Sequence, residues 1–299
     1  MKEKGVQFGT DGKSFRHYVP LLYLPADRPG AKRLLGRPVA MVERFNMAIC
    51  LEDAVLKADR KEAARRVIRW LPSLSAESRR GLFIRPGDKE MFHRLADSAA
   101  ADGIAGFVLP KASVPSISAW CAMLKRKQLL LPVLETRQVF DPQGQRDLAE
   151  VCHAHRSMIP RARIGANDLF SLLGGLRRPR GCTIYETPLA RVIDGLLEQF
   201  SEFDIPLSGC VFDHLDDSDT LRRECVADVS RGLFAKTAIH PRQAELIRES
   251  YRPDALEVAE AKAILCSSSP AVFSLNGSML EPSCHSRWAC KLLERAASF

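Results

Sequence analysis

The chain alternates between short apolar runs and longer stretches of mixed polarity, and this rhythm is what most narrows its fold. The apolar runs are continuous along their length, which is typical of parallel strands buried on both faces. We expect a β-strand in each of them: 20–24, 47–51, 81–85, 104–109, 129–135, 162–166, 206–212 and 232–239. Between them lie stretches of helical length, at 57–71, 89–101, 114–127, 145–156, 189–203 and 219–231.

Strands that alternate with helices imply β-α crossovers and a mostly parallel sheet. Eight such strands in a chain of 299 residues predict a closed (β/α)8 barrel, the TIM barrel. The competing arrangement is an open doubly wound sheet, which would place a glycine-rich phosphate turn after an early strand. Residues 24–27 read Leu-Pro-Ala-Asp, which is not such a turn. The sequence therefore favours the barrel.

Two further segments are expected to flank the barrel, which we place at residues 19–250. Residues 1–18 are charged and have no apolar core, so we interpret them as a flexible N-terminal arm and not as a secretory signal. Residues 251–299 are too few for an independent domain, and we expect them to form a C-terminal helical lid segment. This segment would pack on the barrel or on a neighbouring subunit. Within the barrel, the Gly- and Arg-rich stretch 173–183 is interpreted as an active-site excursion.

Composition excludes several classes of protein. With 46% hydrophobic and 27% charged residues the chain is not disordered, and no run approaches the roughly 20 apolar residues of a membrane span. The formal net charge of +8 could attract an anionic partner, but the basic residues are scattered and no nucleic-acid-binding motif is present. The nine cysteines form no C-x-x-C pair, and several lie in apolar runs, which indicates reduced thiols. We therefore expect a cytoplasmic protein without a nucleic-acid or membrane partner.

An ionisable side chain stands at the end of each expected strand. Catalytic groups of (β/α)8 barrels come from these strand ends and the loops after them. Charges gathered at one rim are costly unless a metal or a charged ligand balances them. The strand-end residues are Asp27, Glu52, Asp53, Arg85, Lys111, Glu135, Asp168, Asp213, Lys236 and His240. The set predicts a functional site, although Lys111, Asp213, Lys236 and His240 could equally brace the rim, and His240 could cap the helix that begins at Pro241.

Glu135 and Asp168 have the character of a hard-metal site. They would lie on adjacent strands with both carboxylates at one rim, and two carboxylates with water and ligand oxygens suit Mg²⁺. Arg85 has a planar, rigid guanidinium group that can bind a carboxylate or an enolate through parallel hydrogen bonds. A metal and an arginine facing one cavity fit carbon–carbon cleavage next to a carbonyl, because the metal polarises the carbonyl and the cation stabilises the oxyanion.

These residues stand in stretches that resemble the citrate lyase β-subunit and malyl-CoA lyase family of (β/α)8 carbon–carbon lyases. The most specific is the string Lys-x-x-Ile-His-Pro-x-Gln that begins at Lys236. The stretches follow the family order across roughly residues 20–297: LYLPADRP (22–29), LEDAV (51–55), FIR (83–85), LPK (109–111), LET (134–136), GANDL (165–169), KTAIHPRQ (236–243) and NGSMLEP (276–282).

The resemblance implies roles for individual residues. Glu135 and Asp168 match the Mg²⁺ ligands of the family, and Arg85 matches its substrate-binding arginine. Glu52 and Asp53 match an acidic pair that supports metal-bound water. Lys111 is expected to help bind the substrate, and Glu281 is our candidate acid/base.

The resemblance also implies a reaction and an assembly. Members cleave or form a bond between a small keto acid and an acyl-thioester enolate, with CoA or an acyl-carrier protein as the thioester. They commonly form trimers or hexamers in which the C-terminal segment of one subunit covers the site of the next. We therefore expect a homo-oligomer that binds Mg²⁺, a keto or hydroxy acid, and a thioester.

Three departures from the family pattern keep other readings open. Val19 and Pro20 occupy the region of a usual arginine, Cys50 stands where an aspartate often precedes Leu-Glu-Asp, and Glu281 replaces the lid aspartate. A glutamate carboxylate sits one methylene further out, which can cost orders of magnitude in rate if the geometry is not corrected. The alternatives are a CoA-independent hydroxy-acid aldolase or thioesterase on the same site, and a catalytically silent barrel that binds a metabolite.

Overall fold

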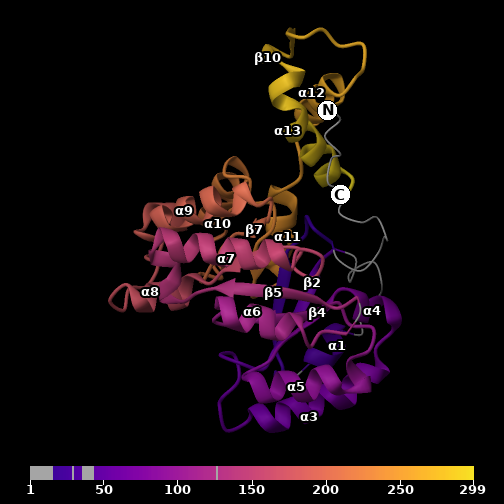
Figure 1. Ribbon diagram of the computed structural model, residues 1–299, viewed down its shortest axis with the longest axis vertical. Coiled ribbons are helices and arrows are strands. Elements are labelled where there is room, and N and C mark those ends of the chain that lie inside the picture. Colours follow the sequence, from indigo (N-terminus) through magenta and orange to yellow (C-terminus); the bar gives the residue numbers. More distant parts are fainter. Residues whose placement is uncertain (1–15, 29, 36–43, 126) are drawn as a thin grey trace.

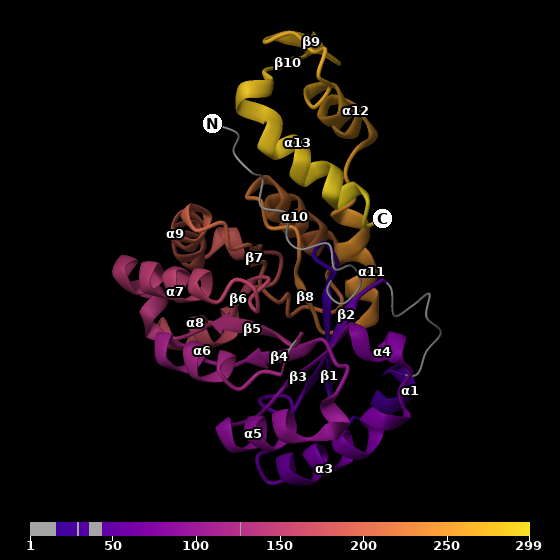
Figure 2. The ribbon, with the colours of Figure 1, turned by 45° about the vertical axis from the view of Figure 1, so that its right-hand side comes forward.

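The computed structural model describes residues 16–28, 30–35, 44–125 and 127–299, so most of the expected N-terminal arm lies outside the described residues. Eight parallel strands form one sheet in the order β7-β6-β5-β4-β3-β2-β1-β8 (Figures 1 and 2). Their bounds are β1 Leu21–Pro25, β2 Asn46–Cys50, β3 Leu82–Arg85, β4 Gly106–Leu109, β5 Leu129–Leu134, β6 Ala162–Ile164, β7 Leu207–Ser208 and β8 Thr237–Ala238.

The sheet closes on itself beside its two shortest strands. Gly209 and Lys236 form a single parallel bridge there, and the N–H of Gly209 donates to the carbonyl of Ala235 at 2.8 Å. The closed cylinder and the helices around it confirm the predicted (β/α)8 barrel.

The helices from α1 to α11 follow the strands in the expected alternation, and Figure 2 shows them around the outside of the barrel. The helix bounds are α1 Ala31–Leu35, α3 Arg60–Trp70, α4 Ala76–Arg80, α5 Lys89–Asp97, α6 Val114–Cys121, α7 Pro142–Ala154, α8 Ala166–Leu172, α9 Leu189–Glu202, α10 Ser218–Ser230, α11 Pro241–Ser250, α12 Ala255–Ile264 and α13 Pro282–Ala296. None of these described helices is long and apolar enough to cross a membrane.

Side chains along the strands alternate between two cores. Leu22 and Leu24 of β1 belong to the large core between the strands and the surrounding helices. Leu21 belongs instead to a smaller cluster with Phe83 and Val133, which fills the inside of the barrel. The inner faces of the strands therefore pack most of the barrel interior with apolar groups, as is usual for this fold.

Helices α12 and α13 form a hairpin that stands away from the barrel and carries the short strands β9 (Phe273–Leu275) and β10 (Ser278–Leu280) at its tip (Figures 1 and 2). The C-terminal end of α13 anchors it, because Tyr18 Oη donates to Glu294 Oε2 at 2.9 Å and the Arg295 guanidinium lies 4.5 Å from the ring centre of Phe234. Tyr18 and Phe234 precede β1 and β8. The hairpin is therefore fixed at the N-terminal end of the barrel, opposite the strand ends that carry the predicted site.

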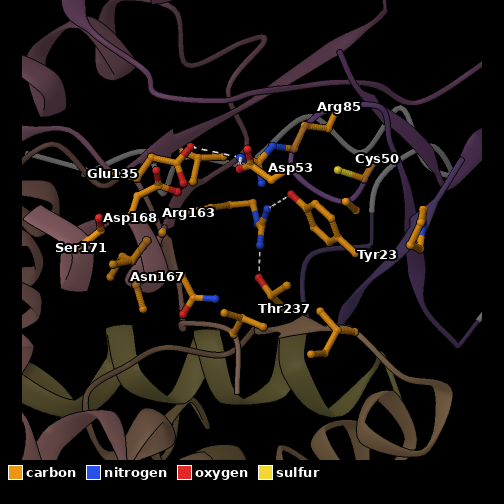
Figure 3. Close-up of a pocket in the computed structure, with 18 of the residues that line it drawn as sticks. Tyr23, Cys50, Asp53, Arg85, Glu135, Arg163, Asn167, Asp168, Ser171 and Thr237 are labelled. Atoms are coloured by element: carbon orange, nitrogen blue, oxygen red, sulfur yellow. Dashed lines mark hydrogen bonds and ion pairs between the residues drawn. The ribbon is translucent and has the colours of Figure 1, made fainter. Parts of the chain in front are cut away.

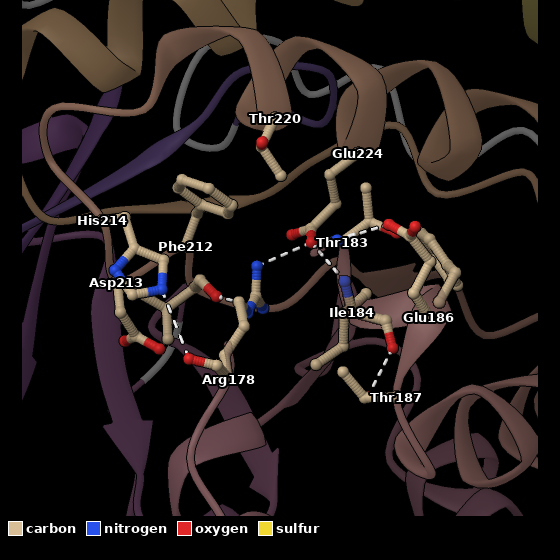
Figure 4. A network of polar contacts seen from close by, with 12 residues as sticks. Arg178, Thr183, Ile184, Glu186, Thr187, Phe212, Asp213, His214, Thr220 and Glu224 are labelled. Atoms are coloured by element: carbon tan, nitrogen blue, oxygen red, sulfur yellow. Dashed lines mark hydrogen bonds and ion pairs between the residues drawn. The ribbon is translucent and has the colours of Figure 1, made fainter. Parts of the chain in front are cut away.

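A fully buried ion network braces the wall of the barrel between β8 and α10. Lys236 Nζ lies 2.8 Å from both Glu224 Oε1 and Asp228 Oδ2, and Arg178 Nη1 lies 2.6 Å from Glu224 Oε2 (Figure 4). The hydroxyl of Tyr251 donates to Asp228 at 2.7 Å. Lys236 is thus one of the bracing residues. The 173–183 segment directs Arg178 into this network and not into the cavity.

Candidate active site

A cavity of about 540 Å³ opens at the carboxyl ends of the strands (Figure 3). Pockets of this size suit small organic ligands. Strands on opposite sides of the barrel contribute to its lining: Tyr23, Cys50, Arg85, Glu135, Arg163 and Thr237, together with Asp168 at the start of α8. The cavity therefore lies where the sequence places the functional site.

Arg85 is the centre of an ion cluster at the cavity mouth. Its Nη2 lies 2.6 Å from Glu52 Oε2, 3.2 Å from Asp53 Oδ2 and 3.3 Å from Glu135 Oε1. The register explains the first two contacts, because Cys50 of β2 pairs with Arg85 of β3 and the acidic pair follows two residues later. Only 12% of the Arg85 side chain is exposed, so the guanidinium is held in one place.

Lys111 connects the same cluster to the far carboxylate. Its Nζ lies 3.0 Å from Glu52 Oε1 and 3.6 Å from Asp168 Oδ1, while its backbone N–H donates to Glu135 Oε1 at 2.8 Å. The residue adopts a left-handed backbone, with φ of 48°, in the turn after β4. Such backbone is unfavourable for a lysine and recurs at functional sites. Here it accompanies the backbone contact to Glu135.

The cluster holds more negative than positive charge, with the four carboxylates of Glu52, Asp53, Glu135 and Asp168 against Arg85 and Lys111. Burial raises the pKa of Glu135 to about 7, and the charges of Asp168 and Glu52 add to this. Burial and the hydrogen bond with Glu52 raise the pKa of Asp53 to about 6. A further cation would favour the ionised form of both groups.

Glu135 and Asp168 fit the requirements of a Mg²⁺ site. A Cβ at position 165 would stand 2.2 Å from Glu135 Oε2, so Gly165 leaves the space in which this carboxylate lies. Among the described residues no group of three or more His, Cys, Asp or Glu side chains is placed to hold a metal. A cation here would therefore be coordinated by these two carboxylates, and water and ligand oxygens would complete its coordination shell. Mg²⁺ commonly binds to proteins in this way.

The structure brings together the six barrel residues to which the family resemblance assigns roles, namely Glu52, Asp53, Arg85, Lys111, Glu135 and Asp168. Glu281 is different: it is the N-cap of α13, its carboxylate accepts from Ser283 Oγ at 2.7 Å, and it is not among the residues that line the cavity. Because its hairpin is anchored at the opposite end of the barrel, Glu281 is separated from the cavity of its own chain. His240 caps α11, as the alternative interpretation held, by accepting from the N–H of Arg242.

Polar residues inside the barrel were not predicted from the sequence. Arg163 of β6 lines the cavity and donates to the hydroxyls of Tyr23 and Thr237 (Figure 3). The available signal was an arginine in the middle of the apolar run 162–166, where the strand pattern calls for buried side chains. At the mouth, Asn167 donates to Asp213 Oδ1 at 3.1 Å, which ties the first turn of α8, where Asp168 lies, to Asp213.

Comparisons with known proteins agree with this arrangement. A family model described as a C-C bond lyase of the TIM-barrel fold matches residues 20–299. A citrate lyase subunit beta-like protein of Deinococcus radiodurans is 27% identical over 278 residues, which cover 87% of this chain and 91% of that protein. A protein of the same description from Mycobacterium tuberculosis is 28% identical over 266 residues, with 87% and 89% covered.

Solved structures show the same fold. The protein CitE of M. tuberculosis, in complex with magnesium, acetoacetate and coenzyme A, superimposes with a TM-score of 0.69 at 24% identity, covering 94% of this chain and 98% of that one. The citrate lyase beta subunit of M. tuberculosis, complexed with oxaloacetate and magnesium, gives a TM-score of 0.59 at 24% identity, covering 79% and 99%. Since the family match extends over residues 20–299, the chain belongs to the carbon–carbon bond lyases of the TIM-barrel fold, as a distant relative of the citrate lyase β-subunit-like proteins.

Proposed function

We propose that the protein is a Mg²⁺-dependent lyase that cleaves or forms the bond between a small keto acid and an acyl-thioester enolate. The observation that carries this proposal is the cluster in which Arg85 and Lys111 join four carboxylates at the mouth of the cavity. It occurs in a chain of the lyase family. Related proteins whose structures contain magnesium with acetoacetate, coenzyme A or oxaloacetate support the choice of ligands.

Glu135 and Asp168 would hold the cation. When bound, Mg²⁺ supplies a Lewis acid that polarises the carbonyl of the keto acid. Both carboxylates must be ionised for this role, and the charge of Arg85 opposes the rise that burial causes in the pKa of Glu135.

Arg85 would stabilise the negative charge that develops on the oxygen of the enolate. Three carboxylates fix its position, and its Nε is buried without a hydrogen-bond partner in the described part of the chain. The guanidinium lines the cavity, so a ligand oxygen there could accept a hydrogen bond from it. A preorganised donor of this kind acts most strongly where charge appears in the transition state.

The proton transfer requires a base outside the metal pair. In the cleavage direction the base takes the proton of the β-hydroxyl, a carbonyl forms at that carbon, and the electrons of the broken bond pass to the α-carbon of the thioester. The resulting enolate is then protonated on carbon. We assign the base to Glu281 of a neighbouring copy in a homo-oligomer, since the hairpin that carries Glu281 is anchored away from the cavity of its own chain.

Asp53 is a second group that can exchange a proton in the cavity. It lines the cavity, and its pKa of about 6 lies close to neutral pH.

The identity of the thioester is a separate part of the proposal. Val19 occupies the region of the usual family arginine, and it is buried with 3% of its surface exposed. A valine is uncharged, so this chain lacks the cation that the family arginine provides in this region. This observation favours, as a second candidate, an aldolase that acts on a free hydroxy acid at the same metal site.

A paired assay separates the two candidates. β-Hydroxyacyl thioesters of CoA and the corresponding free hydroxy acids are incubated with the protein, with Mg²⁺ and with excess chelator, and the released keto acid is measured. Mg²⁺-dependent release from the thioesters alone supports the lyase, and release from the free acids supports the aldolase. Ligand binding without turnover of any member of the panel would instead indicate a silent binding barrel.

A further inference from the structure

Arg163 is a cation inside a barrel whose interior is otherwise mostly apolar. It lies in the middle of β6, paired with Val133 of β5 and Ser208 of β7, and only 4% of the residue is exposed. Figure 3 shows its guanidinium directed across the barrel, where it donates to the hydroxyls of Tyr23 on β1 and Thr237 on β8. Branched apolar side chains usually fill this position in the fold. The arginine therefore calls for an explanation beyond packing.

The charge of Arg163 has no counter-ion among the described residues. Its two partners are hydroxyls, and burial raises the pKa of Tyr23, which keeps that hydroxyl neutral. Its Nε is buried without a hydrogen-bond partner. A guanidinium has five N–H donors, of which the two hydroxyls engage only part. Keeping a cation out of water without an anion costs several kcal/mol.

Three other buried cations of the described residues are paired with carboxylates. Arg178 and Lys236 are wholly buried, and each lies within 2.8 Å of a carboxylate. Arg85, nearly as buried, contacts three. Arg163 also differs from Arg178 and Lys236 because it lines the cavity, as Arg85 does, and an anion could reach it there.

One cavity connects Arg163 with the cluster of Arg85, Glu135 and Asp168. A ligand held at the mouth by its keto-acid end could thus extend inward to the guanidinium. A planar guanidinium flanked by two hydroxyls suits a carboxylate, which can accept two parallel N–H bonds. A purely apolar end would leave the charge of Arg163 unbalanced.

We propose that Arg163, together with Tyr23 and Thr237, binds a second carboxylate of the substrate, so that the keto acid is a dicarboxylate. The inference rests on the proposed function and specifies its substrate class. Arg163 is then a specificity-determining residue that contacts the substrate away from the reacting carbonyl.

Binding of matched acids in the presence of Mg²⁺ tests this assignment. Isothermal titration compares three pairs of equal chain length: 2-oxobutyrate with oxaloacetate, 2-oxopentanoate with 2-oxoglutarate, and 2-oxohexanoate with 2-oxoadipate. In at least one pair the dicarboxylate should bind about 10- to 100-fold tighter, the range expected for a charge-assisted hydrogen bond. The chain length with the largest gain reports how far Arg163 stands from the bound keto group.

Variants assign the preference to this side chain. Arg163→Met should remove the preference for the dicarboxylate while leaving the affinity for the monocarboxylate within about twofold. Arg163→Lys keeps the positive charge but loses the two parallel N–H donors of the guanidinium, so it should keep part of the preference for the dicarboxylate. If the methionine variant does not fold, the lysine variant shows whether Arg163 causes this preference. Arg161→Met is the matched control, because Arg161 is equally buried next to β6 but does not line the cavity. It should leave the preference unchanged.

The outcomes separate this inference from the function on which it rests. If the wild-type protein binds the monocarboxylates but binds the dicarboxylates no more tightly, the proposed role of Arg163 is wrong. The proposed metal site is not affected by this result. A preference that survives undiminished in both Arg163 variants overturns it as well. If no acid of either series binds with Mg²⁺, both proposals fall together.

Discussion

Glu135 and Asp168 differ in their surroundings although we assign them one task. The Glu135 side chain is 3% exposed and contacts both Arg85 and the backbone of Lys111, whereas the Asp168 side chain is 31% exposed. Burial raises the pKa of the Glu135 carboxyl to about 7, so this group gains most from a cation beside it. Asp168 faces the open side of the cavity.

Replacing either carboxylate by its amide should remove the metal site without unfolding the protein. We expect Glu135→Gln and Asp168→Asn to lower Mg²⁺ affinity by at least about tenfold and to abolish turnover, since an amide supplies no charge to the cation. Magnesium titration calorimetry and circular dichroism measure the two properties. Asp194→Asn, which changes an exposed carboxylate of α9 that does not line the cavity, serves as the control. Mg²⁺ binding at wild-type strength in Glu135→Gln would contradict the assignment.

His17 makes the stability of the protein depend on pH. Burial, with the charge of Arg161 adding to it, lowers the pKa of His17 to about 4 in the folded state, whereas an unfolded histidine has a pKa of about 6.5. Above this value the histidine is neutral in both states. Between about pH 6.5 and 4 the unfolded chain takes up a proton that the folded chain does not, so the free energy of unfolding falls as the pH falls.

Urea denaturation at pH 7.5 and pH 5 measures this effect. We expect the free energy of unfolding to drop by roughly 1–3 kcal/mol more in the wild type than in His17→Phe. His93→Gln, in α5, controls for the loss of a histidine elsewhere and should keep the wild-type dependence. An equal drop in the wild type and in His17→Phe would show that other groups dominate.

At the scale of elements, the sequence predicts most of the barrel because its strands are continuous apolar runs. The runs at 47–51 and 81–85 mark β2 and β3 to within a residue, since every side chain of a strand buried on both faces is selected for burial. The ion cluster was predictable for a related reason: once the barrel closes, the strand ends that carry Arg85 and Glu135 must meet at one rim.

Partners that depend on side-chain direction could not be predicted in the same way. Lys236 stands at a strand end, like the site residues, but its side chain turns into the wall toward Glu224 and Asp228. The side chain of Arg163 points into the barrel from a strand whose other residues are apolar, so the pattern of the strand did not predict a polar group there. The position of Glu281 depends on how the C-terminal hairpin docks, and local pattern does not encode this.

Breaking the buried network at Lys236 should be costly. Lys236→Met would leave Glu224 with Arg178 as its one cation and Asp228 with hydroxyl partners only, so we expect a loss of about 3–5 kcal/mol in the free energy of unfolding. Chemical denaturation monitored by tryptophan fluorescence measures it. Arg180→Ala breaks an ion pair to Asp216 whose side chains are 69% and 71% exposed, and should change stability by less than about 0.5 kcal/mol. A similar small effect in Lys236→Met would mean that the network is not a brace.

At the scale of the whole molecule, the anchored hairpin bears on the assembly. Tyr18 and Arg295 fix α13 at the N-terminal end of the barrel, so the α12–α13 hairpin does not cover the cavity mouth of its own chain. A hairpin that projects from one copy (Figure 2) is free to reach the mouth of another. This arrangement is the basis for assigning Glu281 to a neighbouring site.

Subunit mixing tests whether the site is shared. Glu135→Gln and Glu281→Gln should each be inactive as pure oligomers. After the two are mixed under conditions of subunit exchange, activity should return, because some interfaces combine an intact metal pair with an intact Glu281. Lyase activity before and after mixing is the measurement, and Glu135→Gln mixed with Asp168→Asn is the control that should stay inactive. Activity in pure Glu281→Gln would remove this residue from the mechanism.

The closure of the barrel has a consequence for the cavity. Every pair of neighbouring strands shares two or more paired residues, but the last seam is held by the single bridge of Gly209 and Lys236. Val211 and Thr237, which flank this seam, line the cavity. That side of the cylinder therefore depends less on strand pairing than on the buried ion network of Lys236, Glu224 and Asp228. Substitutions that loosen this network should change the shape of the cavity next to Thr237 and leave the carboxylate rim undisturbed.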